Sequence, residues 1–208
     1  MKRGITKSAL ALTLLMSANL AVQAQEAKWD GPFGLKEGLS RAEIAKVVKI
    51  EKVGNTLSYT ADKLPIPHPA FSWYALTISE SVGLCAILAV SPTKPSDAFG
   101  DTLRQSFDAL KDPLTLRYGK QTRGVDSVRS GSIWRDPQDF MMGMLKGERK
   151  LNAIWETTKA KPLPSSLSLI ALIASAESSS TGRVSLHYTF SNNDKCEAEK
   201  KANDNRGL

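Results

Sequence analysis

Stretches with the hydrophobic spacing of an α-helix alternate along this chain with stretches that have the spacing of a β-strand. The points where the spacing changes mark the boundaries of the predicted elements. Ser40 and Glu43 form a capping-box pattern, in which the serine accepts a free backbone N–H and the glutamate reaches back. Ile44, Val47 and Val48 follow at the spacing of one helix face. The pattern therefore predicts a first helix that begins after Ser40.

A longer helical pattern occupies residues 102–118. Pro113 lies within it and should kink or break the helix, because proline lacks a backbone donor and clashes with the preceding turn. A third helix is expected from Asp136, where a cap is followed by proline at the first helical position. Residues 120–132 are polar and glycine-dotted, which is typical of a loop, and residues 195–203 predict a short last helix.

Six shorter stretches have the composition and bounding turns of strands. The last of them alternates without a break, because Val184, Leu186, Tyr188 and Phe190 face one side and polar residues lie between them. The predicted strands are residues 56–60, 71–78, 84–90, 151–156, 167–174 and 184–190.

The order of these elements occurs twice. When residues 40–79 are laid on residues 136–175, helix meets helix, and a strand, a proline-rich loop and a second strand follow in both. The predicted fold is α+β, with two tandem helix-plus-antiparallel-hairpin halves (residues 25–119 and 120–208) and helices packed on one side of the sheet. Two ordinary stretches of α+β chain that look alike are the alternative.

Residues 1–24 have the three parts of a secretory signal peptide. Three basic residues precede an apolar stretch that ends at Val22-Gln23-Ala24, a small-x-small cleavage site. A membrane anchor is the alternative, but the apolar core is shorter than the about 20 residues that span a bilayer. We expect cleavage after Ala24, a mature protein in the periplasm or secreted, and no membrane span.

Charge and cysteine content narrow the possible partners. The chain carries 28 Lys and Arg against 21 Asp and Glu, a formal charge of +7, which falls by three to +4 without the leader. This excess is too mild for a nucleic-acid-binding surface but suits an acidic protein partner.

Cys85 and Cys196 are the only cysteines, and in an exported chain they are expected to form a disulfide.

Most common enzyme chemistries lack their motifs in this sequence. The chain has no H-E-x-x-H, G-x-S-x-G, P-loop or dinucleotide-binding pattern. Two distant cysteines do not make a zinc site, so no metal or other cofactor is expected. His68 and His187 are the only histidines, and their use in catalysis stays open as the alternative.

The aromatic residues point instead to a protein interface. Adjacent Trp73 and Tyr74 face opposite sides of a predicted strand, so one of them is expected to be exposed. Trp134 and Arg135 follow a polar loop, and Trp, Tyr and Arg are the usual anchors of interfaces. His68 lies in a rigid proline-rich loop that loses little entropy on binding. These five residues are the candidate binding residues, and a core position for the tryptophans is the alternative.

A short N-terminal motif resembles the entry of small exported helix-plus-sheet modules. It reads Trp29-Asp30-Gly31-Pro32-Phe33-Gly34-Leu35, then Gly38-Leu39-Ser40 and a helix. Such modules include outer-membrane assembly lipoproteins of the SmpA/OmlA type and tandem-repeat β-lactamase inhibitory proteins, and Leu116-Arg117-Tyr118-Gly119-Lys120 is similar to a phrase common in them. The likeness covers residues 29–48 and 103–120, and the lipoprotein cysteine is absent. It implies a binding role rather than catalysis.

Two function classes follow from these observations. The first is an exported non-catalytic binding protein, such as an inhibitor, an immunity-type protein or an envelope assembly factor, that acts through a protein–protein surface. The second is a periplasmic hydrolase of cell-wall material that uses His68 or His187.

Overall fold

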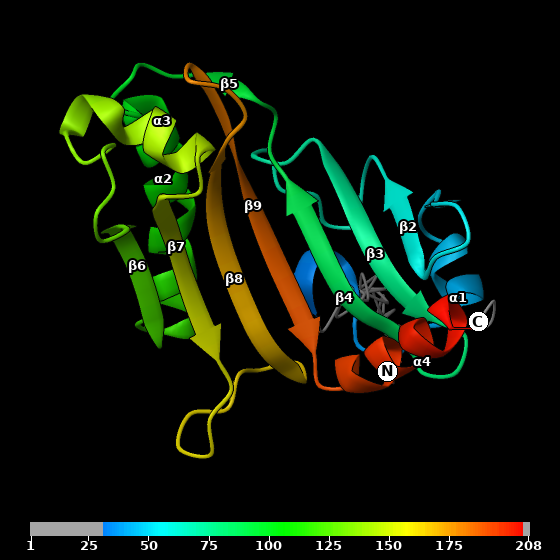
Figure 1. Ribbon diagram of the computed structural model, residues 1–208. Coiled ribbons are helices and arrows are strands. Elements are labelled where there is room, and N and C mark those ends of the chain that lie inside the picture. Colours follow the sequence, from blue (N-terminus) through cyan, green and yellow to red (C-terminus); the bar gives the residue numbers. More distant parts are fainter. Residues whose placement is uncertain (1–30, 206–208) are drawn as a thin grey trace, which may run out of the picture.

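One large antiparallel sheet organises residues 31–205, the part of the chain that the computed structural model describes (Figure 1). The signal peptide predicted for residues 1–24 lies outside this range. No helix within the range is both long and apolar enough to cross a bilayer.

The helices are α1 (Arg41–Ala45), α2 (Asp101–Tyr118), α3 (Phe140–Leu145) and α4 (Asn193–Asp204), with 3-10 turns η1 (Pro32–Gly34) and η2 (Pro137–Asp139). The strands are β1 (Glu51–Lys52), β2 (Ser58–Ala61), β3 (Trp73–Ser79), β4 (Gly83–Val90), β5 (Lys94–Pro95), β6 (Arg123–Val128), β7 (Arg149–Glu156), β8 (Leu167–Ala176) and β9 (Thr181–Phe190).

The strand order is β1-β2-β3-β4-β9-β8-β7-β6, and β5 pairs with one end of β9. All of these pairs are antiparallel. Strands β4 and β9 meet at the centre, where Ala86 pairs with Thr189 and Val90 with Ser185. The β3–β4 and β8–β9 hairpins therefore lie side by side although they are far apart in the sequence (Figure 1). The fold class is α+β, as predicted.

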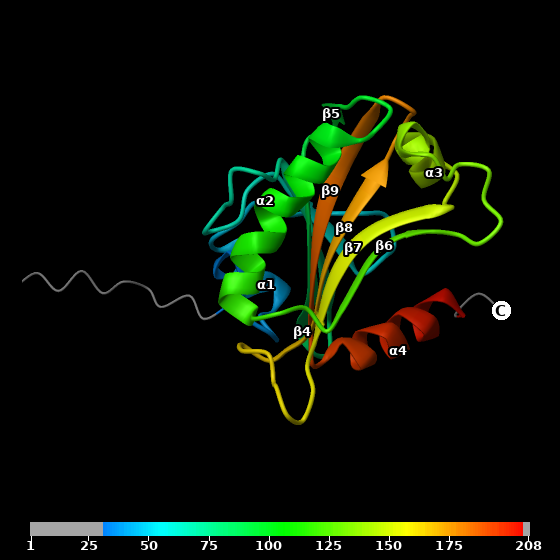
Figure 2. The same ribbon diagram turned by 90° about the vertical axis from the view of Figure 1, so that its left-hand side faces the viewer.

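Three helices bury one face of this sheet, which we call the helix-covered face. Strand β9 alternates as predicted, with Val184, Leu186, Tyr188 and Phe190 all buried. Helix α2 packs on β8 and β9, and Figure 2 shows α1 and α2 on the same side of the sheet. Helix α3 packs on β7 and β8, and its Phe140 ring lies under the guanidinium of Arg104 in α2. These contacts join the three helices and the sheet into one apolar core.

The fourth helix corrects the prediction that all helices pack on one side. Helix α4 contacts β3 and β4 from the opposite side of the sheet (Figure 2). The strand register shifts after Thr77, which leaves Cys85 as the extra residue of a β-bulge. Cys85 and Cys196 of α4 are buried at disulfide-bonding distance, as predicted, with Cα atoms 6.5 Å apart. The bulge thus gives α4 its attachment on that side.

Two local predictions were also wrong. Residues 123–128 form the edge strand β6 rather than a loop, and the apolar alternation is missing because neither side of this strand is fully buried. Helix α2 continues through Pro113 without a break. Pro113 and Ala109 are both exposed, so the carbonyl that proline leaves without a donor can face water.

Candidate functional site

The side of the sheet opposite α1, α2 and α3 is the candidate site, and we call it the open face. Along each strand every second residue points into the core, and the residues between them point to the open face. Strand pairing places these outward residues next to one another in rows that cross the sheet. The central row crosses seven strands and consists of Thr60, Ala75, Leu88, His187, Ala171, Ile154 and Arg123.

Two further rows flank the central row. Most residues in all three rows are half-buried, as expected on a hollowed surface. One flanking row consists of Trp73, Val90, Ser185, Ile173, Asn152 and Val125. The other consists of Ser58, Thr77, Ala86, Thr189, Leu169 and Glu156.

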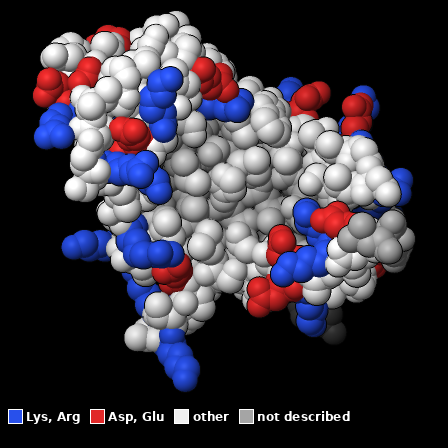
Figure 3. Space-filling view, viewed as in Figure 1, with Lys and Arg blue, Asp and Glu red and all other residues white. Residues whose placement is uncertain are grey.

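The middle of the open face is hollowed and carries no formal charge. From β2 to β8 the three rows contain no Lys, Arg, Asp or Glu, and they offer aliphatic groups, small hydroxyls, the indole of Trp73 and one imidazole. Figure 3 shows this uncharged hollow with charged side chains around its edge. Such a surface can pack closely against another uncharged surface without burying an unpaired charge.

Charged pairs mark two borders of the hollow. Arg123 of β6 and Glu156 of β7 form an ion pair at one edge of the sheet. Arg183, near the start of β9, pairs with Glu177 at 2.9 Å. Each cation already has an anionic partner, so these pairs set the border of the hollow without making it strongly charged.

Helix α4 forms the third border and is held there by a carboxylate. Glu199 accepts hydrogen bonds from the hydroxyls of Ser79 and Ser81 and from the backbone N–H of Glu80. The hydrogen bond from Ser79 is the main reason that the pKa of Glu199 is lowered, against a smaller effect of burial. The Cys85–Cys196 pair fixes the same helix to β4, so this border is rigid.

His187 is the only titratable side chain among the middle positions of the open face, from β2 to β8. It stands opposite Leu88 on one neighbouring strand and Ala171 on the other. Burial lowers its pKa, because desolvation disfavours the charged imidazolium. The Nε2 atom lies 3.3 Å from the hydroxyl of Ser185, two residues earlier on the same face.

The structure separates the predicted pair Trp73 and Tyr74 as their adjacent positions require. Trp73 belongs to the open face and is half-buried, so it can contact a partner. Tyr74 is 1% exposed in the core of the helix-covered face, where its hydroxyl accepts a hydrogen bond from the backbone N–H of His68. Tyr74 therefore cannot serve as a contact anchor.

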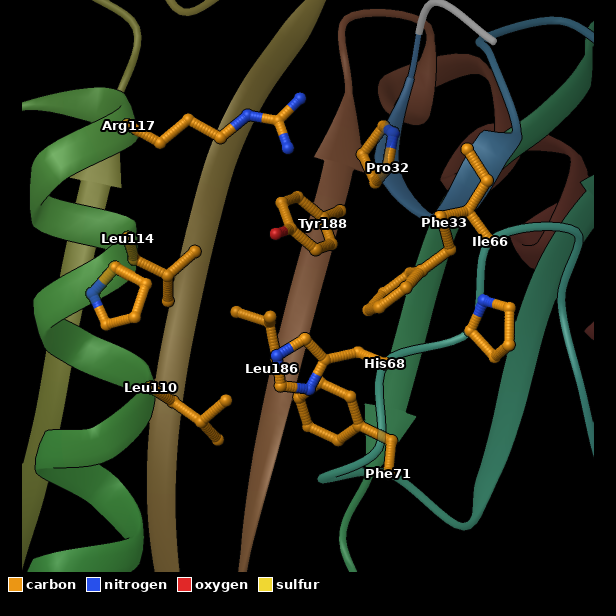
Figure 4. Close-up of a pocket in the computed structure, with 12 residues that line it drawn as sticks. Pro32, Phe33, Ile66, His68, Phe71, Leu110, Leu114, Arg117, Leu186 and Tyr188 are labelled. Atoms are coloured by element: carbon orange, nitrogen blue, oxygen red, sulfur yellow. The ribbon is translucent and has the colours of Figure 1, made fainter. Parts of the chain in front are cut away.

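The other predicted residues lie away from Trp73. Trp134 is half-buried and Arg135 exposed in the segment before η2, where their carbonyls accept hydrogen bonds from Arg149. Three strands, β4, β9 and β8, separate β3 from β7, so this pair does not join Trp73 in one cluster. His68 lies on the opposite side of the molecule, beside a cavity on the helix-covered face (Figure 4).

Sequence reasoning missed most of the open face. The alternation in residues 184–190 places His187 opposite the core positions, which was the available signal for one strand. The pairing of β4 with β9 joins the two hairpins into one surface, and no local pattern encodes that pairing.

The described residues give no metal centre, since no three His, Cys, Asp or Glu side chains among them are grouped to hold an ion. Compared with known proteins, the chain matches no family model, no curated protein and no solved structure.

Proposed function

We propose that this protein is an exported, non-catalytic binding protein that holds another protein against its open face. The observation that carries the proposal is the uncharged hollow in the middle of a broad sheet face, bordered by ion pairs and by a covalently held helix. Surfaces of this kind, with an uncharged centre and a polar rim, are typical of protein interfaces.

The dimensions of the hollow favour a macromolecule over a small ligand. From β2 to β7 the rows cross five inter-strand steps, which at about 4.8 Å each span roughly 24 Å. A small metabolite would contact only a fraction of that width. A protruding loop or hairpin of a folded partner fits it better, with Trp73 at one end and Ile154 near the other.

The charge distribution favours a protein over a nucleic acid. Phosphate contacts require clustered Lys and Arg, and the middle of the open face has neither. The partner we propose has an uncharged contact centre and an acidic periphery, because the mature chain keeps a formal charge of +4, three below the +7 of the full sequence.

The hydrolase alternative is weakened by what surrounds His187. A hydrolase of this kind would use Ser185 as nucleophile and His187 as base, but the hydroxyl–imidazole distance of 3.3 Å is long. Within residues 31–205 no carboxylate hydrogen-bonds His187 to orient it. The neighbouring backbone N–H groups belong to strand ladders, so they do not form an oxyanion hole.

The proposal includes an origin by internal duplication. Apart from the two-residue strands β1 and β5, both of which lie in the first half, the order helix, three strands, helix occurs as α1, β2, β3, β4, α2 and again as α3, β7, β8, β9, α4. The strand order runs outward from β4 and β9 in the same sense, although α2 and α4 lie on opposite sides of the sheet. This repetition supports the proposed relation to tandem helix-plus-sheet inhibitory modules. In this interpretation the strands of the open face come from two related halves of the chain.

A capture experiment with paired variants tests the proposed function. Leu88→Arg puts a charge into the middle of the open face, and Leu116→Arg puts the same charge on α2, where Leu116 is 90% exposed. We expect wild-type protein and Leu116→Arg to retain the same protein from envelope extract, and Leu88→Arg to lose it while unfolding at a similar temperature. Equal retention by all three would refute the assignment of this face.

Export has its own test. The intact mass of protein recovered from the envelope should correspond to a chain that begins at Gln25. A full-length mass or a lipid-modified N-terminus would contradict this part of the proposal.

A further inference from the structure

A cavity on the helix-covered face is separate from the open face. It lies between α2 and the proline-rich loop at residues 65–69, and β9 forms its floor (Figure 4). Its volume is about 230 Å³. That is below the roughly 300–1,000 Å³ of pockets for drug-sized ligands, so it suits a smaller molecule.

The walls of this cavity are apolar and held rigidly. Phe33 forms part of the wall, and its ring packs edge-on against Phe71 and Tyr188, each 5.7 Å away between ring centroids. Its backbone has φ 53°, an uncommon conformation for a residue with a side chain, which the surrounding contacts must maintain. The facing wall is supplied by Leu110 and Leu114 of α2. A preformed wall of this kind loses little entropy when a ligand binds.

Three polar side chains line the cavity, and two of them, His68 and Arg117, can donate a hydrogen bond to a ligand. His68 accepts a hydrogen bond from the backbone N–H of Ala70 at Nδ1, 3.2 Å away, which leaves Nε2 as the donor of the ring. Tyr188 hydrogen-bonds Tyr118, and burial raises the pKa of Tyr188, so its hydroxyl stays protonated. Arg117 supplies a permanent positive charge. Among residues 31–205, no Asp or Glu lines the cavity.

Arg117 is placed to act on a ligand. Figure 4 shows its side chain reaching from the last turn of α2 across the cavity toward Pro32 and Tyr188. Within the described part of the chain its guanidinium has no ion-pair partner. Its central carbon lies over the ring of Tyr118, 5.4 Å from the centroid. A carboxylate here would gain a charge-assisted, geometrically matched interaction.

We propose that this cavity binds a small apolar monocarboxylate, with its hydrocarbon part between Leu114 and Phe33 and its carboxylate at Arg117. A single anionic group matches Arg117, the one cation among the described lining residues, and the remaining lining favours hydrocarbon. A dicarboxylate would leave its second charge against the apolar wall. This site lies across the sheet from the open face and does not depend on the proposed function.

Two matched ligand pairs and three variants test the site by isothermal titration calorimetry. Octanoate is compared with octanol, and phenylacetate with phenylethanol, so that each pair differs in the carboxylate. Arg117→Gln removes the charge from the exposed last turn of α2, and Arg129→Gln removes one from an exposed position far from the cavity. Ile66→Ala trims the apolar rim, where Ile66 is 51% exposed, without touching the charge.

We expect at least one carboxylate to bind saturably, with a dissociation constant of about 1 mM or below. Arg117→Gln should weaken it about tenfold and leave the matched alcohol unaffected. Arg129→Gln should change neither ligand, and Ile66→Ala should weaken both. The site is refuted if neither carboxylate binds saturably up to ~10 mM. Binding that Arg117→Gln and Arg129→Gln affect equally would also overturn it.

Discussion

The two faces of the sheet use neighbouring residues of the same strands for opposite purposes. Leu76 is completely buried under the helices, while Thr77, the next residue, faces outward on the open face. Likewise Tyr188 lies in the core and His187 lies opposite it on the open face. Stability therefore depends on one set of alternating positions, and the other set is free to serve recognition.

The largest expected effect separates the two faces within β3. Leu76→Ala should lower the free energy of unfolding by about 2–5 kcal/mol, because it leaves a cavity in a packed core. Thr77→Ala should change it by about 0.5 kcal/mol or less, since this side chain borders solvent. Urea denaturation of the two variants provides the measurement. Equal losses would mean that the open face also belongs to the core.

Removal of the disulfide tests how α4 is held on the open face. Cys85→Ala combined with Cys196→Ala should lower the free energy of unfolding by about 2–4 kcal/mol and raise hydrogen exchange in α4. Lys200→Ala is the control, because it removes only the exposed pair with Asp204 on the same helix. If α4 exchanges at the wild-type rate in the double variant, Glu199 and packing hold the helix without the disulfide.

The smallest expected effect is a pH dependence that comes from His187. Burial lowers its pKa in the folded chain, so the unfolded chain binds the proton more readily. Stability should therefore be constant above the unfolded value of about pH 6.5 and decline as the pH falls below it. In thermal unfolding between about pH 5 and 7, His187→Gln should flatten this decline. His68→Gln, which alters the other face, should leave the decline in place.

The sequence correctly predicted the elements in which the local residue pattern matches the burial that the residues have in the fold. The capping box at Ser40 is present, with its serine accepting from the N–H of Glu43. The alternation in β9 gave both its core side and its outward side. Prediction failed where packing outweighs pattern: Val47 fits the helical stripe but is 49% exposed, because α1 already ends at Ala45.

The site itself could be predicted only in part, for a physical reason. The sequence predicted that one of the adjacent residues Trp73 and Tyr74 is exposed. In the structure Tyr74 is buried, so Trp73 is the accessible one. The remainder of the open face consists mainly of alanine, serine, threonine and aliphatic side chains. None of these residue types indicates a binding site by itself. They become a surface only when β4 pairs with β9, and long-range pairing is not written in any short segment.

Site-specific photo-crosslinking tests the central claim most directly. A photoreactive residue is placed at Ile173, in the hollow of the open face, and in a second strain at Leu116, on the exposed side of α2. In cells that export the protein, we predict a crosslinked adduct with one partner protein from position 173 and none from position 116. An adduct that forms only from position 116, or equally from both, would contradict the assignment of the open face as the binding surface.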